Sequence, residues 1–226
     1  MRGRRGRWLV ATVMVAVAAL ASACGGGDSG GALPQRSATP HAGAATRHGA
    51  TARTDATPTP TPTGPYDPVR FAAQVRKHAR EARIAPQLLM AILYNESDKP
   101  HDPAFERAWQ RIKPDAAFGI ADMHKAAFDE VKRGRSFADR RWDELPDDPD
   151  LAITAAAWYL HDLAVRLPTR WSGRYTRNDL LALGYNAGPG NMLAFARGAR
   201  PGSVAQSYLD RLHQTWKTAG RALHGR

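Results

Sequence analysis

The segment PQLLMAILYNES, residues 86–97, decides the fold class of this chain. Pro86 suits the first position of a helix, where its missing N–H group is not needed. The run LLMAIL that follows has no polar interruption, which predicts a buried helix. Glu96 comes at the end of this helix, so we expect its carboxyl to lie at the edge of a buried element. Partial burial favours the protonated form of a carboxyl, and a general acid needs that form near neutral pH.

Apolar residues recur at helical spacing along the rest of the chain from residue 67 onward. Asp67-Pro68 and Asp148-Pro149 each combine a capping side chain with proline at the first helical position. Thr176 can cap a further helix, and a last helix is expected to carry Val204, Tyr208, Leu212 and Trp216. No stretch alternates with period two, so we predict an all-α domain with little or no sheet, at most one short hairpin.

Two glycine-containing segments stand out beside the first: FGIADM at 118–123 and GYNAGPGN at 184–191. Gly119 permits a close backbone approach or an unusual dihedral angle. The Gly-Pro-Gly turn of the other segment is expected to end a helix and to present Tyr185 and Asn186. Taken singly, each segment has a plainer interpretation: a solvated surface glutamate, a loop-to-helix turn and a helix stop.

In this order and spacing, the three segments resemble the soluble lytic transglycosylase (SLT) family, which has a lysozyme-like fold. The Glu-Ser motif of the family falls on Glu96-Ser97, its Gly-x-x-Gln-Met stretch on 119–123, and its Ala-Tyr-Asn-Ala-Gly motif on 184–188. The resemblance covers about residues 70–197. It implies a lysozyme-like helical domain that acts on the glycan strands of peptidoglycan.

The chain departs from the family pattern at a few positions. Asp122 stands where the family has glutamine, and Gly184 stands where it has alanine. Asp122 puts a charged group in place of a neutral amide near the cleft. An insertion at about 98–117 is idiosyncratic, and within it His101-Asp102-Pro103 is interpreted as a turn.

The resemblance implies a mechanism with one catalytic acid and base, Glu96, and with no cofactor and no metal. Glu96 would protonate the β-1,4 linkage between N-acetylmuramic acid and N-acetylglucosamine, and would then deprotonate the C6 hydroxyl to close a 1,6-anhydro ring. The residues expected to bind the substrate are Ser97, Gly119, Asp122, Met123, Tyr185 and Asn186. One alternative is a hydrolytic muramidase in which Asp122 positions water. Another is an inactive lipoprotein that binds the cell wall.

The N-terminus has the features of an exported protein. Residues 1–23 combine a basic stretch, a short apolar stretch and small residues, which predicts a signal peptide. Cys24, the one cysteine of the chain, follows in a context that resembles a bacterial lipobox, so we expect it to be lipidated and to anchor the protein at the outer face of the membrane. Cleavage after Ala23 would instead give a secreted protein. Residues 24–66 are rich in Gly, Ala, Thr and Pro and predict a disordered tether, so the folded domain is expected at 67–226.

The net charge of +11 falls to +7 without the four arginines of the leader, since 28 basic and 21 acidic residues remain. This excess either favours anionic partners such as lipid headgroups or acidic wall polymers, or reflects only a compositional bias toward arginine, because the basic residues form no single run. For an exported protein we expect no nucleic-acid partner, and we expect a monomer. The histidines show no metal-ligand spacing, and the chain contains no HExxH, GxSxG or GxxxxGK[ST] motif. Trp142 and Trp171 are candidates for either core or sugar-stacking residues, and of the two roles we expect the core.

Overall fold

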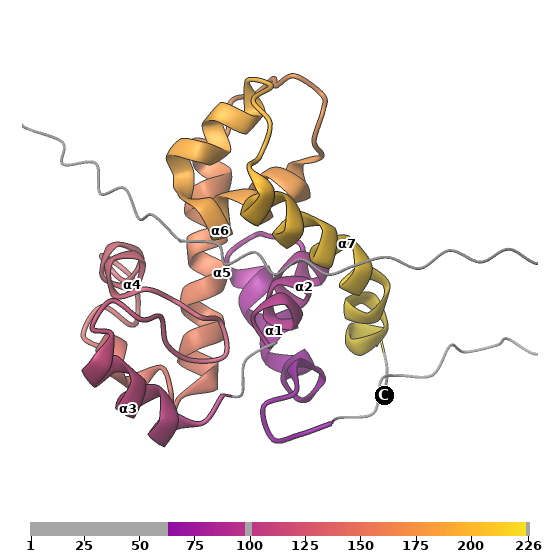
Figure 1. Ribbon diagram of the computed structural model, residues 1–226. Helices are drawn as coiled ribbons and strands as arrows, with labels where there is room; N and C mark the ends of the chain where they lie inside the picture. Colours follow the sequence, from indigo (N-terminus) through magenta and orange to yellow (C-terminus); the bar gives the residue numbers. More distant parts are fainter. Residues whose placement is uncertain (1–62, 98–100, 225–226) are drawn as a thin grey trace, which may run out of the picture. The chain divides into compact units, whose positions relative to one another are not determined.

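Helix α2 (Pro86–Glu96) is the buried helix that the sequence predicted, and it lies near the centre of the helical domain (Figure 1). The computed structural model describes residues 63–97 and 101–224. All six residues from Leu88 to Leu93 are fully buried. Helices α1 (Ala72–Glu81), α6 (Arg177–Ala196) and α7 (Ser203–His224) contact α2, and its packing against α7 is the most extensive of these.

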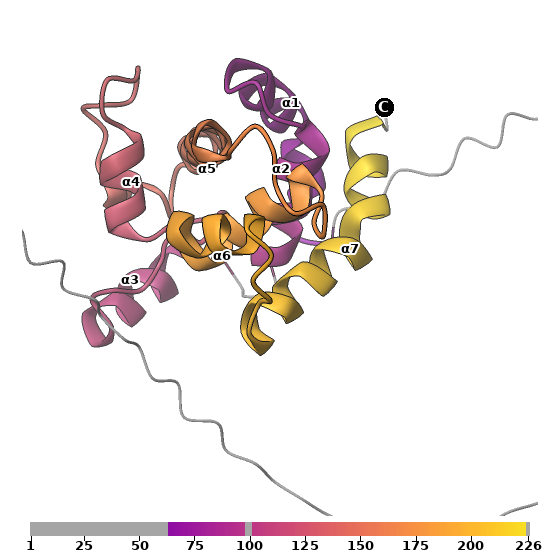
Figure 2. The ribbon, with the colours of Figure 1, turned by 90° about the horizontal axis from the view of Figure 1, so that it is seen from above.

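The remaining helices complete an all-α domain. Helix α5 (Pro149–Arg166) packs against α1 on one side and α4 (Lys125–Val131) on the other, as the end-on view in Figure 2 shows. Helix α3 (Pro103–Ile112) and two short 3-10 helices, Pro68–Phe71 and Trp142–Glu144, complete the set. Within the described ranges, the single β-type pairing is an isolated bridge between Phe118 and Met123. The predicted fold class, all-α with little or no sheet, is therefore confirmed.

The predicted helix starts are confirmed because each depends on local capping chemistry. The Asp67 carboxylate accepts the N–H of Val69 at 3.0 Å, and the Asp148 carboxylate accepts the N–H of Leu151 at 3.0 Å. Thr176 forms a reciprocal capping box with Asp179.

Three local expectations need correction. His101-Asp102-Pro103 is not a simple turn, because the Asp102 carboxylate accepts the N–H of Phe105 at 2.8 Å and caps α3. Gly188, at φ +84°, interrupts α6, yet a second helical segment starts at Pro189 instead of a loop. In α7, Tyr208 is buried, but Val204 is 73% exposed and does not belong to the packed face.

The predicted signal peptide, the lipidated Cys24 and nearly all of the predicted linker lie outside the described residues. These assignments, and the boundary at residue 67, stay predictions. No helix in the described part of the chain combines the length and the apolar character needed to span a membrane.

Candidate active site

The carboxyl of Glu96 lies where α7 crosses the C-terminal end of α2. The phenol of Tyr208 on α7 donates a hydrogen bond to Glu96 Oε1 at 2.8 Å. The preceding residue, Asn95, is buried and donates from Nδ2 to the main-chain carbonyl of Tyr208 at 2.9 Å. Two hydrogen bonds thus tie α7 to the end of α2, and Tyr208 restricts the orientation of the Glu96 carboxyl, which is partly exposed.

The environment of Glu96 keeps two phenols protonated. Burial raises the pKa of Tyr208 well above its ordinary value, and the nearby Glu96 carboxylate raises it further. Burial likewise raises the pKa of Tyr185, with added contributions from the negative charges of Glu96 and Asp122. Both tyrosines therefore remain hydrogen-bond donors at any physiological pH.

Tyr185 joins α6 to the turn that carries Asp122. Its phenol donates to the carbonyl of Ala121 at 2.7 Å, and its ring packs edge-to-face on Tyr159 with centroids 5.5 Å apart. Since the charges of both Glu96 and Asp122 act on Tyr185, the fold brings these three predicted site residues together from three segments.

The turn at 118–123 is held in an unusual backbone conformation. Phe118 and Met123 exchange two main-chain hydrogen bonds at 3.1 and 3.0 Å, and Gly119 has φ +73°. A Cβ atom on Gly119 would lie 2.7 Å from the carbonyl oxygen of Leu145, so the prediction of close backbone approach is confirmed. Asp122 also has a positive φ, +44°, which aspartate adopts more readily than most residues.

Trp142 supports this turn from the core. Its ring is 4% exposed and stacks on Phe118 with centroids 4.2 Å apart. Its indole N–H donates to the carbonyl of Met123 at 2.7 Å. The expectation that Trp142 is a core residue is confirmed, and Trp171 is partly buried against the core.

The other predicted site residues lie in more varied settings. Ser97 donates its hydroxyl to the carbonyl of Tyr94 at 2.9 Å, so it completes the last turn of α2. Met123 is 2% exposed, whereas Asn186 is exposed. Contact of these three residues with a substrate stays a prediction. Gly184 has a packing reason, because a Cβ there would lie 2.8 Å from the sulfur of Met192.

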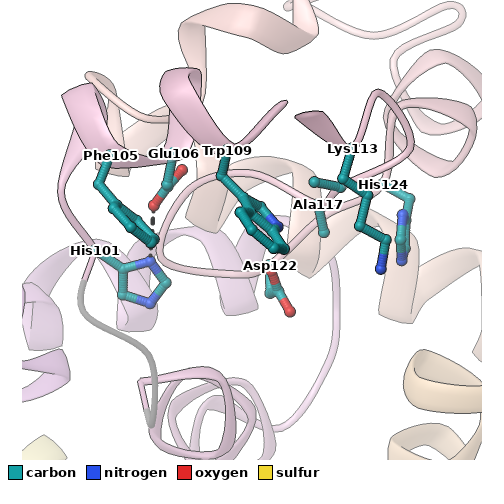
Figure 3. Close-up of a pocket in the computed structure, with 9 residues that line it drawn as sticks. His101, Phe105, Glu106, Trp109, Lys113, Ala117, Asp122 and His124 are labelled. Carbon is teal, nitrogen blue, oxygen red and sulfur yellow. Dashed lines mark hydrogen bonds and ion pairs between the residues drawn. The ribbon is translucent and has the colours of Figure 1, made fainter. Parts of the chain in front are cut away.

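A pocket of about 520 Å³ adjoins Asp122 (Figure 3). One wall is α3, from which Phe105 and Trp109 project, and Asp122 lies below the Trp109 ring in this view. Lys113 and His124 lie next to each other at one end of the pocket. The described residues contain no group of three or more His, Cys, Asp or Glu side chains that could hold a metal ion.

Sequence reasoning missed Tyr208 as a site residue. Helical spacing placed Tyr208 on the last helix, but nothing in its neighbourhood indicated that α7 would cross α2 at Glu96. The contact joins residues that are 112 positions apart, and such long-range pairs leave no local signal.

The chain matches a known protein family. The family model described as "Transglycosylase SLT domain" matches residues 73–201, which is more than half of the chain. Glu96, Asp122 and Tyr185 lie inside the matched range, whereas Tyr208 lies just beyond its end. No curated protein and no solved structure matches the chain significantly.

Proposed function

The chain belongs to the transglycosylase SLT domain family, and from this premise we propose that it is a peptidoglycan lytic transglycosylase whose catalytic acid and base is Glu96. Membership of the family implies a transglycosylase-type enzyme with peptidoglycan glycan strands as its substrate. The assignment of Glu96, the reaction steps and the product are our proposal.

In the first proposed step, Glu96 donates its proton to the oxygen of the β-1,4 linkage between N-acetylmuramic acid and N-acetylglucosamine. The C–O bond of muramic acid breaks, and the acetamido oxygen of the substrate stabilises the cationic carbon. In the second step, the ionised Glu96 accepts the proton of the C6 hydroxyl, whose oxygen bonds to that carbon. The product is a 1,6-anhydro ring, and no water is consumed.

The observation that carries this proposal is the Tyr208–Glu96 hydrogen bond at 2.8 Å. Because burial and the Glu96 charge keep Tyr208 protonated, the phenol still donates after Glu96 has given up its proton. The bond then becomes charge-assisted and stronger, which stabilises the carboxylate between the two steps. The same bond orients the carboxyl, so that less conformational freedom is lost in the transition state.

Glu96→Gln tests the proposal, because the amide cannot donate the proton. We expect release of muropeptides from purified cell walls to fall by about two orders of magnitude or more, while circular dichroism shows an unchanged helical fold. The control is Glu130→Gln on α4, an exposed residue whose carboxylate pairs with Arg166. It should retain wild-type activity. Equal activity of Glu96→Gln and wild type would refute the assignment.

Hydrolysis is a second candidate because Asp122 adds a carboxylate to the Glu96–Tyr185 cluster and lines the adjoining pocket. Such a carboxylate could hold an attacking water. Asp122→Asn separates the two reactions. A lyase keeps most of its activity in this variant, since Asp122 has no proton-transfer role there, whereas a hydrolase that uses Asp122 as its base loses activity.

An inactive wall-binding protein is the third hypothesis. The experiment on wild-type protein decides it: sedimentation with purified cell walls without any release of muropeptides would support a binding role.

We also propose that the protein is exported and anchored by a lipid on Cys24 at the outer face of the membrane. The support is the sequence of the N-terminal segment together with the location of peptidoglycan outside the membrane. Metabolic labelling with a radioactive fatty acid should mark the wild-type chain but not Cys24→Ala. A secreted, unlabelled wild-type protein would contradict the anchor.

A further inference from the structure

Five arginines gather at one end of the domain, on the two connections that flank α6. Two lie on the connection between α5 and α6, one begins α6, and two follow its C-terminal end: Arg170, Arg174, Arg177, Arg197 and Arg200. All five are exposed. We call this set the arginine patch.

A direct backbone contact holds the two connections together. The N–H of Ser172 donates to the carbonyl of Ala196 at 3.0 Å, and a Cβ added to Gly198 would lie 3.7 Å from the Cβ of Ser172. The indole of Trp171 donates to the carbonyl of Tyr175 at 2.9 Å, which closes the first connection on itself. Figure 1 shows the connection between α5 and α6 beside the C-terminal end of α6. Arginines from distant parts of the sequence therefore contribute to one surface.

The positive charge of the arginine patch is largely uncompensated. None of the five side chains forms a hydrogen bond or an ion pair with another residue that the structure describes. Residues 167–204 contain these five arginines and one acidic residue, so the net charge of this stretch is +4. The acidic residue is Asp179, which accepts the N–H of Thr176 at 2.9 Å and bonds to His213 at 2.7 Å. Its carboxylate is thus already engaged, and the patch presents free cations to an outside partner.

Exposed apolar side chains occur beside these arginines. Val204, four residues after Arg200, is 73% exposed, and Val165, five residues before Arg170, is 71% exposed. Guanidinium groups bind phosphate through paired N–H donors. Basic and apolar side chains on one surface are typical of proteins that lie on anionic membranes. A soluble phosphate polymer would satisfy the arginines but would leave the valines in water.

We propose that the arginine patch docks the domain on an anionic lipid surface, with the guanidinium groups bound to the phosphates of the headgroups. The choice of a lipid surface rests on the proposed anchor at Cys24, because a lipid-anchored chain already lies beside a membrane. Part of the basic excess of the sequence thereby acquires a role, since the fold gathers arginines that form no run along the chain.

Docking through the arginine patch leaves the pocket beside Asp122 open. Arg107 of α3 forms an ion pair with Asp147, just before α5 begins, whereas the patch starts just after α5 ends. The 18 residues of α5 span about 27 Å, and Figure 1 shows α3 and the connection between α5 and α6 at opposite ends of the domain. None of the five arginines lines the pocket. A docked domain therefore keeps this pocket accessible to a glycan strand.

Vesicle sedimentation tests the proposal with the chain that lacks the predicted signal peptide, residues 24–226, carrying Cys24→Ala so that no lipid is attached. The vesicles consist of phosphatidylcholine, alone or with about one third phosphatidylglycerol. The chain should bind the anionic vesicles but not the neutral ones, and about 0.5 M salt should release it because salt screens exposed charges. Arg174→Gln combined with Arg200→Gln should weaken binding by about tenfold or more. Lysine at both positions keeps the charge and should restore most of the binding.

The charge-matched control combines Arg80→Gln with Arg133→Gln. Both arginines are exposed, lie on α1 and just after α4, and have side chains without a partner among the described residues. This variant loses the same net charge but should bind the anionic vesicles nearly as well as the parent chain. Equal weakening by the two double variants would overturn the proposal, because total charge and not the arginine patch would then drive binding.

Two other results would assign the patch to a different partner and would also overturn the proposal. One is patch-dependent binding of a soluble glycerol-phosphate polymer without any binding to vesicles. The other is loss of cleavage of membrane-free cell walls in the Arg174 and Arg200 double variant, for which we expect the wild-type rate. The vesicle assay contains neither substrate nor lipid anchor, so an inactive enzyme or an unlabelled Cys24 would leave its result standing.

Discussion

Replacing Gly119 with alanine tests how the turn before Asp122 is positioned. Gly119 has φ +73°, and an added Cβ would lie 2.7 Å from the carbonyl oxygen of Leu145 and 3.1 Å from its carbonyl carbon. These are backbone atoms, so the neighbour cannot rotate away. The same glycine gives its N–H to Glu106, which means that a displaced turn also disturbs the attachment of α3.

The expected loss of stability has two parts. A left-handed backbone costs alanine about 1–2 kcal/mol relative to glycine. Steric overlap in a packed region adds about 1–3 kcal/mol, so Gly119→Ala should lower the free energy of unfolding by about 2–5 kcal/mol. Gly134→Ala is the matched control. Gly134 has φ +69° but no atom within 4 Å of an added Cβ, so this variant should lose only the first part, about 1–2 kcal/mol.

Urea unfolding followed by circular dichroism gives both free energies. We also expect Gly119→Ala to lose activity on cell walls under conditions where it remains folded. The reason is that a shifted turn moves the Ala121 carbonyl that accepts the Tyr185 hydrogen bond, and so moves Tyr185 beside Glu96. Equal destabilisation by the two glycine variants, with activity retained in both, would refute the argument that contact with Leu145 fixes the turn.

Three further predictions concern the tyrosines and the helix caps. Tyr208→Phe keeps the ring but removes the hydrogen bond to Glu96, so cell-wall cleavage should fall by about tenfold or more; an unchanged rate would show that the bond has no role. Above pH 10 the phenols of the unfolded chain ionise. Burial raises the pKa of Tyr94 to about 12 and raises the pKa values of Tyr208 and Tyr185 well above the ordinary value, so these phenols stay protonated in the folded protein. The free energy of unfolding should therefore fall as pH rises above about 10, by about 1.4 kcal/mol per pH unit for each of the buried phenols of Tyr208 and Tyr185, and a flat profile from urea unfolding would contradict this. Thr176→Ala removes the side-chain cap of α6 and should lower the free energy of unfolding by about 1 kcal/mol. An unchanged free energy of unfolding in calorimetry would exclude a stabilising contribution of this cap.

Helix starts were predictable because capping is local. Asp67, Asp148 and Thr176 each accept a main-chain N–H two or three residues ahead, and such spacing can be recognised in a sequence. Asp102 at α3 has the same chemistry. The sequence did not predict the helix that follows Asp102, because the large apolar residues of this helix are exposed. It therefore lacks the buried apolar face by which a helix is recognised in a sequence.

The site was predictable only where a motif marks it. Glu96, Asp122 and Tyr185 lie in three motif segments, and the fold brings them together. Tyr208 could not be found in the same way, because its role depends on the crossing of α7 over α2. The Glu106–Gly119 hydrogen bond was missed for a related reason: it joins an unpredicted helix to the turn.

Mass spectrometry of the fragments released from purified peptidoglycan by the wild-type chain tests the central claim most directly. A single acid and base at Glu96 predicts fragments that end in 1,6-anhydro-N-acetylmuramic acid, one water lighter than hydrolysis products. Fragments with reducing N-acetylmuramic acid ends, which incorporate oxygen from isotopically labelled water, would contradict the account and assign the chain to hydrolysis.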